Sequence, residues 1–217
     1  VFAENTAEAL QFTRKAQDEF ALTSLDRALK ASEDGTFSNE IEPVTVKIGK
    51  EVCRISSDEQ LRNARPDKIP NLKPAFTTDG TVTAANSSSI SDGAAALVVM
   101  RLSEAEKQYC KPLAVIRAHA THAAEPEWFT TAPIGAINKV IQKAGWEKKD
   151  VDLFEVNEAF AVVVLATMKE LGLSHGKVNV HGGACALGHP IGASGARIVV
   201  TLLNALKKYD LDKGVAS

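Results

Sequence analysis

The chain has 217 residues, of which 45% are hydrophobic and 24% are charged. These values are typical of a globular protein with an ordinary core, and they exclude an intrinsically disordered chain. With 25 basic and 27 acidic side chains the formal net charge is only -2, so no global field would draw the protein onto nucleic acid or an anionic membrane.

The first part of the chain is predicted to be a peripheral, loop-rich domain, residues 1–90. Residues 6–33 carry apolar side chains every three or four positions, which predicts two helices or one broken helix ending before Gly35. Residues 44–48 alternate apolar and polar side chains as a strand does. Residues 58–73 are polar and contain prolines, so we expect them to run over the surface.

Residues 91–217 are predicted to form a layered α/β core, because short apolar runs alternate with longer helical patterns. Ser103 followed by Glu106 predicts a capping box at a helix start. The last two helices have nearly unbroken apolar runs and are expected to be buried on most sides, and another strand is expected to start near Gly214. The strands are expected at 94–100, 113–116, 151–156 and 178–180, and the helices at 136–144, 159–171 and 193–206.

Three cysteines, Cys53, Cys110 and Cys185, lie far apart without a CxxC pair. This pattern favours free thiols in a reducing compartment and predicts no bound metal. No signal pattern and no run of eighteen apolar residues is present, so we expect a cytoplasmic protein, or one of the mitochondrial matrix in a eukaryote, with no membrane partner. The absence of an initiating Met suggests a product cut from a longer polypeptide.

Two expected strand-to-helix junctions carry candidate site residues. Asn157-Glu158 interrupts apolar sequence at the first junction, and His189 lies in the second, the glycine-rich stretch 179–195. Because the carboxyl ends of strands face the amino ends of helices in such folds, Asn157 and His189 could meet in a crevice there. A histidine beside a helix amino terminus could act as a neutral base, and its N–H with a water held by Asn157 could stabilise an oxyanion.

Alternative interpretations of the second junction remain open. His189 could be a structural hydrogen-bonding residue, and the glycines could mark a phosphate-binding turn. The glycine spacing fits neither the Walker A motif nor a dinucleotide fingerprint.

Family resemblance adds to this interpretation. Asn157-Glu158-Ala159-Phe160 followed by residues 182–195 (GGACALGHPIGASG) closely resembles the paired NEAF and GGAxxLGHPxGxSG motifs of thiolases. Residues 81–96 (TVTAANSSSISDGAAA) resemble the thiolase segment TVTAxNxSxxxDGAAA, and the resemblance spans essentially the whole chain. It implies that residues 91–217 are a thiolase-like layered α/β/α half-domain, truncated before its last strands, and that residues 1–90 are the remainder of an α+β coenzyme A-binding loop domain.

The resemblance implies a biosynthetic-type acetyl-CoA C-acetyltransferase, which condenses two acetyl-CoA to acetoacetyl-CoA or catalyses the reverse thiolysis, in fatty acid or ketone body metabolism. It implies that His189 activates a nucleophilic cysteine and lines the oxyanion hole, while Asn157 fixes the water that completes this hole. Pantetheine-contacting positions are implied at Phe76, Ala84, Ser88, Ala159 and Phe160, a grip on the nucleotide end of coenzyme A at Arg65, Asp67 and Lys68, and an acyl-pocket position at Phe129.

Several features depart from the thiolase pattern. The motif of the nucleophilic cysteine and the CxGGG motif are absent, so the chain alone is expected to be inactive and to need the missing amino-terminal half. Cys185 is interpreted as a small buried hydrophobe. Phe129-Thr130 matches neither acyl-pocket pair of the family, Met-Gly or Phe-Pro, and Arg65 with its charged neighbours could simply be a solvated loop.

Coenzyme A thioesters are expected as substrates, and no permanently bound cofactor is expected. The potassium-binding branch of the family carries Tyr and Ala where Leu25 and Ser87 stand, so a potassium site is not implied. The family implies a homodimer or homotetramer. The alternatives are a non-catalytic thiolase-like protein that binds acyl-CoA or lipid, and a decarboxylating condensing enzyme, whose site residues usually combine differently.

Overall fold

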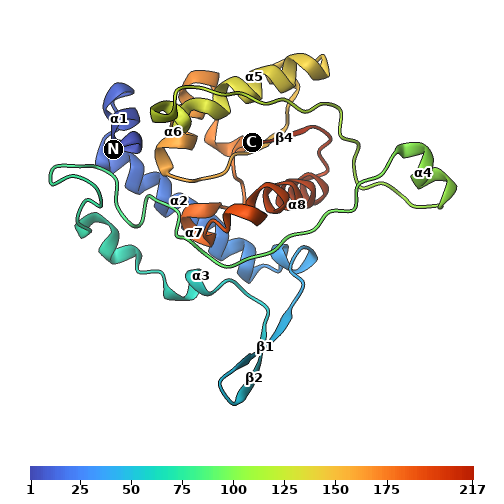
Figure 1. Cartoon of the computed structure of the whole chain (residues 1–217), viewed down its shortest axis with the longest axis horizontal. Coiled ribbons are helices and arrows are strands. Elements are labelled where there is room, and N and C mark those ends of the chain that lie inside the picture. The colour runs from blue at the N-terminus through green and yellow to red at the C-terminus, as the bar shows by residue number, and fades with distance from the viewer.

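A computed structural model describes all 217 residues of the chain (Figure 1). The helices are α1 (Phe2–Ala9), α2 (Arg14–Glu33), α3 (Glu59–Asn63), α4 (Leu102–Lys107), α5 (Ala132–Ala144), α6 (Ala161–Leu171), α7 (Ala184–Leu187) and α8 (Ile191–Tyr209). Short 3-10 helices are η1 (Thr36–Asn39), η2 (Pro66–Asn71), η3 (Pro126–Thr131), η4 (Lys148–Asp150) and η5 (His175–Lys177). The strands β1 (Val44–Ile48) and β2 (Glu51–Ile55) form one antiparallel pair, and β3 (Leu153–Glu155) and β4 (Gly214–Ala216) form one parallel pair.

The core of the molecule surrounds the parallel strands β3 and β4, in which Leu153 pairs with Gly214. All three residues of β3 are buried. Because side chains alternate along a strand, its two faces meet different helices. Phe154 packs with apolar residues of α5 and α6, whereas Leu153 packs with apolar residues of α8. The strands therefore lie between α5 with α6 on one face and α8 on the other, and Figure 1 shows β4 between α5 and α8.

Helix α2 connects the first ninety residues to this core. It begins at the N-cap Thr13, whose hydroxyl accepts a hydrogen bond from the backbone N–H of Ala16 at 3.1 Å. Phe20 belongs to the main core cluster. Leu25 and Ala28 form a second cluster with residues of α3 and α7. One helix therefore contributes to both clusters and supports the glycine-rich stretch that α7 interrupts.

The structure confirms most of the helices expected from the sequence, with the predicted break in residues 6–33 between α1 and α2. Helices α5, α6 and α8 cover the three helical patterns of the second half, and β1, β3 and β4 cover three of the expected strands. Helix α6 is buried along most of its length, as expected. Helix α8 is not: its buried residues lie mainly on one face.

Two expected strands are absent, at 94–100 and at 113–116. Their side chains are largely solvent-exposed, 89% for Val98 and 83% for Leu113. The apolar runs predicted strands, but a strand requires a hydrogen-bonded neighbour, and neither run pairs with another strand. The strand expected at 178–180 is reduced to a single parallel bridge between Val178 and Phe154.

Smaller corrections concern local structure. Helix α4 begins after Arg101 and has no side-chain cap, so the predicted capping box of Ser103 and Glu106 is wrong. The stretch 58–73 is mostly exposed as expected, yet it contains α3 and η2. Strand β2 was not expected. The division at residue 90 stays a prediction.

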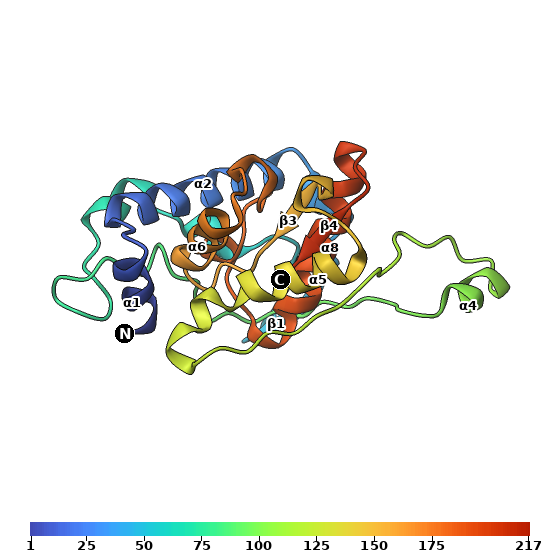
Figure 2. The ribbon, with the colours of Figure 1, turned by 90° about the horizontal axis from the view of Figure 1, so that it is seen from above.

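Two projections extend from the body of the molecule. One is the hairpin of β1 and β2 (Figure 1), and the other is α4 with the extended segments on either side of it (Figures 1 and 2). Cys53 lies on the hairpin and Cys110 lies just after α4. None of the helices combines the length and the apolar character that a membrane crossing would need.

The glycine at position 182 supplies a first test of how α2 supports the site. Gly182 has φ +77°, and an added Cβ would lie 2.8 Å from Ala28 Cβ and against the carbonyl of Ser24. Gly145 has a similar φ of +71° with nothing within 4 Å. Gly145→Ala should therefore lower the unfolding free energy by only ~1 kcal/mol, the cost of the backbone conformation, whereas Gly182→Ala should lower it by roughly 2–4 kcal/mol.

Urea unfolding of both variants measures this difference. Equal destabilisation by the two substitutions would show that α2 does not pack closely on the glycine-rich stretch.

Candidate active site

The candidate site lies where the glycine-rich stretch meets the start of α8. Gly188, with φ +91°, places His189 immediately before Pro190, the N-cap of α8. The His189 backbone N–H donates to the carbonyl of Ser89 at 3.0 Å, which holds the histidine against the 88–95 segment. An open pocket of ≈ 390 Å³ lies alongside, lined by residues 91–95 and 190–193. His189 is therefore fixed directly before the α8 residues that line this pocket.

A serine on α8 assigns the protonation state of the imidazole. Ser194 Oγ donates its single hydrogen to the carbonyl of Pro190 at 3.1 Å, and it lies 2.6 Å from His189 Nδ1. With that hydrogen used, Oγ can only accept from Nδ1–H. On this ground we assign the neutral ring the Nδ1–H tautomer, which leaves a lone pair on Nε2, as a general base requires.

Asn157 lies beside that lone pair. It follows the carboxyl end of β3, and its Nδ2 lies 3.3 Å from His189 Nε2, where the amide donates to the ring nitrogen. Its backbone N–H donates to the carbonyl of Ser217 at 2.8 Å, so the end of β4 also reaches this point. The structure thus brings together the two residues that the sequence placed at separate junctions.

Electrostatics keep His189 neutral. Burial lowers its pKa from the ordinary value of 6.5, and the positive charge of Arg197 on α8 lowers it further. Loss of solvation is the larger of these two causes. The arrangement can accept a proton from a thiol at neutral pH and then present an N–H and an amide N–H to the same point.

A buried carboxylate supports the loops around the site. Glu158 is fully buried and accepts hydrogen bonds from Ser24 Oγ at 2.7 Å, Asn179 Nδ2 at 2.8 Å and the backbone N–H of Cys185 at 3.0 Å. Burial raises its pKa, and these hydrogen bonds oppose the rise. The Gly183 N–H donates to Ser24 Oγ at 3.0 Å, so α2, β3 and the glycine-rich stretch meet at one side chain.

The residues assigned to the pantetheine arm form a wall next to this point. The backbone N–H and the hydroxyl of Ser88 both donate to the carbonyl of Ala159 at 3.0 Å. The Phe160 ring lies edge-on to Phe76 at 6.2 Å and to Phe129 at 6.4 Å between centroids. Phe76 and Phe129 remain 47% and 43% exposed, so their rings are available to a ligand. Ala84 is also exposed on the same turn-rich segment.

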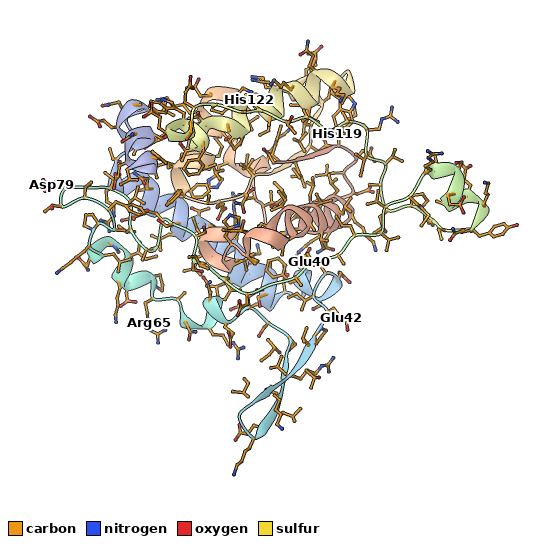
Figure 3. The ribbon with its side chains drawn as sticks, viewed as in Figure 1. Glu40, Glu42, Arg65, Asp79, His119 and His122 are labelled. Carbon is orange, nitrogen blue, oxygen red and sulfur yellow. The ribbon has the colours of Figure 1, made fainter.

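The charged residues assigned to the nucleotide end lie on a different element. Arg65 is the N-cap of η2, and Asp67 and Lys68 lie within it, all three exposed. None of them forms an ion pair, and Figure 3 shows Arg65 on the outer side of the molecule. Their side chains are free to meet a phosphate but are not held together.

No cysteine of the chain is suited to be the nucleophile. Cys185 Sγ lies 3.8 Å from the carbonyl of Glu158, and burial with the Glu158 charge raises its pKa well above the usual range. Such a thiol does not ionise at neutral pH. Cys53 and Cys110 lie on the two projections. No set of three or more His, Cys, Asp or Glu side chains is arranged to bind a metal ion.

Sequence reasoning missed three residues around the site: Ser194, Glu155 and Arg197. Ser194 could have been found, because it lies five positions after His189 in the same motif. Glu155 and Arg197 could not, because a charged residue in an apolar strand or helix gives no indication of the partner it meets.

Comparisons with known proteins agree along the whole chain. The family models described as thiolase N-terminal domain and thiolase C-terminal domain match residues 1–103 and 110–217. The cytosolic acetyl-CoA acetyltransferase of Mus musculus is 48% identical over 220 residues, which cover 100% of this chain and 55% of that protein. The mitochondrial acetyl-CoA acetyltransferase of Bos taurus is 50% identical over 99% of this chain and 51% of that protein.

Solved structures give the same result. The crystal structure of the Bacillus anthracis acetyl-CoA acetyltransferase superposes with a TM-score of 0.96 at 45% identity, covering 100% of this chain and 55% of that one. The acetyl-CoA acetyltransferase of Syntrophomonas wolfei gives a TM-score of 0.91 at 38% identity. The chain therefore has an α/β fold shared with these proteins, and it spans about half the length of the curated relatives it matches.

The Ser194 contact can be tested by the tautomer of His189. Ser194→Ala removes the only acceptor of Nδ1–H, so the neutral ring should shift from the Nδ1–H tautomer toward the Nε2–H tautomer. Nitrogen-15 NMR of the imidazole at pH 7 measures the populations, with His189→Gln to assign the signals. Ser91→Ala, which removes a nearby hydroxyl that does not touch the ring, is the control; no shift in the Ser194 variant would contradict the assignment.

The burial of Glu155 can be tested by the pH dependence of the unfolding free energy. Burial raises its pKa from an ordinary 4.5 to about 8, so the folded state holds this proton more tightly than the unfolded state. The resulting stability is complete below the unfolded pKa and is lost as pH rises through the folded pKa. Between about pH 5 and 8, the unfolding free energy of the wild type should fall relative to Glu155→Gln by up to ~1.4 kcal/mol per pH unit.

Urea unfolding of both proteins at three pH values across this window measures the effect. Glu40, whose pKa burial raises to about 7, is present in both, so the difference between them isolates Glu155. If the unfolding free energies of the two proteins changed with pH in parallel, Glu155 would not be desolvated in the folded state.

Proposed function

The chain belongs to the thiolase family, and we propose that it carries the histidine half of the active site of an acetyl-CoA C-acetyltransferase. Such an enzyme condenses two acetyl-CoA to acetoacetyl-CoA and coenzyme A, or catalyses the reverse thiolysis. The observation that carries the proposal is the contact between Asn157 and the free Nε2 of a neutral His189. The names of the relatives support the acyltransferase activity.

In the proposed first half-reaction, His189 Nε2 takes the proton of a cysteine thiol. The resulting thiolate attacks the carbonyl carbon of acetyl-CoA, a new carbon–sulfur bond forms, and the bond to coenzyme A breaks. The proton returns from Nε2–H to the departing coenzyme A thiolate. The Nδ1–H bond to Ser194 keeps the ring oriented through both transfers.

Asn157 and His189 together are proposed to stabilise the oxyanion. The amide Nδ2–H points at the same place as His189 Nε2. Once Nε2 is protonated, both groups are donors, and an acyl oxygen or a water held by Asn157 can accept from them. A preformed pair of donors needs no reorganisation when charge develops on the oxygen.

The nucleophile is proposed to come from residues outside this chain. Cys185 is disfavoured by its raised pKa, and Cys53 and Cys110 lie on the projections. The curated relatives are about twice as long, which leaves room for a further half carrying a cysteine. For the second half-reaction, a base would take a proton from the α-carbon of a second acetyl-CoA. The carbanion would attack the acetyl-cysteine, forming the carbon–carbon bond and releasing the cysteine sulfur.

Coenzyme A thioesters are the proposed substrates, with no permanently bound cofactor. The wall of Ser88, Ala159 and the three Phe rings of residues 76, 129 and 160 suits an extended pantetheine arm, because it combines a backbone carbonyl with apolar faces. The exposed charges of η2 suit the phosphates of the nucleotide end. The Leu25 side chain lies in an apolar cluster and offers no oxygen, so no potassium site is proposed there.

The proposed assembly is a homodimer or homotetramer of the complete protein. The relatives include cytosolic and mitochondrial acetyl-CoA acetyltransferases, and we propose the cytosol or the mitochondrial matrix as the compartment. Acetyl-CoA and acetoacetyl-CoA are the proposed reactants.

Substitution of His189 tests the proposal. In the complete polypeptide, His189→Ala should lower turnover by about 10²–10⁴-fold, because the thiol loses its base, while coenzyme A binding stays nearly intact. His119→Ala, at an exposed histidine (Figure 3), should leave both unchanged. Thiolysis of acetoacetyl-CoA measures turnover, and isothermal titration with coenzyme A measures binding.

Two outcomes would overturn the assignment. Near-normal turnover of His189→Ala would remove the base role from this residue. A wild-type protein that binds acyl-CoA without any turnover would instead support a non-catalytic binding protein of the same fold.

A further inference from the structure

Most of the unpaired buried polar atoms belong to Asn157 and to three charged residues, Glu40, Glu155 and Arg197. Seven buried side-chain nitrogen and oxygen atoms have no hydrogen-bond partner, and five of them belong to four residues: Glu40 Oε2, Glu155 Oε2, Asn157 Oδ1, and Arg197 Nε and Nη1. The two Arg197 nitrogens are donors and Asn157 Oδ1 is an acceptor, whereas a carboxyl oxygen of Glu40 or Glu155 accepts when ionised and can donate when protonated. Complementary unpaired groups on elements that pack together can share one partner.

The four residues come from three elements that pack together. Leu153 of β3 packs on α8, and Glu155 points to the same side because it lies two residues further along the strand. Asn157 lies just beyond the strand and beside His189, which precedes α8. On α8, Thr201 lies one turn after Arg197 and donates to Glu40 Oε1 at 3.3 Å, which places Glu40 beside this helix (Figure 3).

The guanidinium of Arg197 faces several acidic groups without touching any of them. Burial raises the pKa values of Glu40, Asp58, Glu155 and Glu158, and the positive charge of Arg197 opposes each of these rises. Yet Arg197 forms none of the ion pairs of the structure, and its Nε and Nη1 have no acceptor. Charges that interact across more than the length of a hydrogen bond leave room for a small polar molecule between them.

Water has the chemistry that this place requires. A buried water makes about three hydrogen bonds, to donors and acceptors alike, and such waters occupy polar sites whose groups are otherwise unsatisfied. The two donors of Arg197 and the oxygens of Glu155, Asn157 and Glu40 supply both kinds. A metal ion does not fit, because a guanidinium is part of the lining.

We propose that Arg197, Glu155, Glu40 and Asn157 form a buried site for ordered water, and that Arg197 acts through this water as a positioning residue for Asn157. The water donates to Asn157 Oδ1 and accepts from the guanidinium. The amide is thereby held with Nδ2 toward His189. A rotated amide would set Oδ1 against the lone pair of Nε2, two acceptors facing each other, and would remove the donor that the oxyanion needs.

The wild-type protein gives the most direct test. A high-resolution crystal structure should show ordered water within hydrogen-bond distance of Arg197 Nε or Nη1 and of Asn157 Oδ1. A direct ion pair between Arg197 and Glu155 that leaves no water next to Asn157 would overturn the proposal. This measurement requires neither a variant nor any activity.

Titration of His189 provides a second readout. Arg197→Met removes a positive charge that faces the imidazole from α8, so the pKa of His189 should rise toward 6.5 when followed by NMR. Arg14→Met is the matched control, because Arg14 is also partly buried but binds Asp18 and the Ile69 carbonyl directly. An unchanged titration in the Arg197 variant, or an equal shift in the control, would overturn the proposal.

The kinetic readout rests on the proposed function. In the complete enzyme, Arg197→Met should lower kcat at least tenfold with little change in KM, but should have less than a twofold effect when Asn157→Ala is already present. Independent losses in both backgrounds would show a merely structural role. The two proposals can fail separately. If the wild-type protein does not turn over substrate, the proposed function fails. The positioning inference still stands if the ordered water and the shift in the His189 pKa are observed.

Discussion

The site depends on the buried carboxylate of Glu158. Its oxygens accept hydrogen bonds from Ser24 on α2, from Asn179 and from the Cys185 N–H, three points that are far apart in the sequence. Gly183 lies so close that an added Cβ would overlap the carboxyl group. A carboxylate buried at this cost is stable only while all of its donors are present. This single group therefore couples the position of α2 to the glycine-rich stretch that carries His189.

Long helices could be predicted from the sequence because their signal is local. The 3.6-residue periodicity of α2, α5 and α8 is present in each segment whatever it packs against. Strands were predicted less well. The apolar run at 94–100 indicates only that its side chains can be buried, and it does not indicate which strand pairs with it. The Ser103 cap failed for a similar reason: α4 starts one residue before the serine, so its hydroxyl lies inside the helix and does not cap it.

The candidate site shows the same division. The NEAF and GHP motifs indicated Asn157 and His189, and their contact followed from the rule that strand ends face helix starts. The other features of the site depend on distances in the folded protein, which the spacing of residues in the sequence does not give. Whether Arg65 lies near Lys68, whether Ser194 meets Nδ1 or Nε2, and which face of α8 holds a charge are all decided by packing.

The cause of the neutral histidine has a consequence for the assembled protein. A helix dipole acts through the backbone and is present whenever α8 is folded, but desolvation depends on what covers the ring. The residues just after His189 line an open pocket, and a segment or ligand that covers the imidazole itself would remove water from it. Closure would then lower the pKa of His189 further and would also strengthen the hydrogen bonds that Asn157 and the ring offer to an oxyanion. Covering the ring would therefore keep it more completely neutral but would also make it a weaker base, so the two effects of desolvation oppose each other.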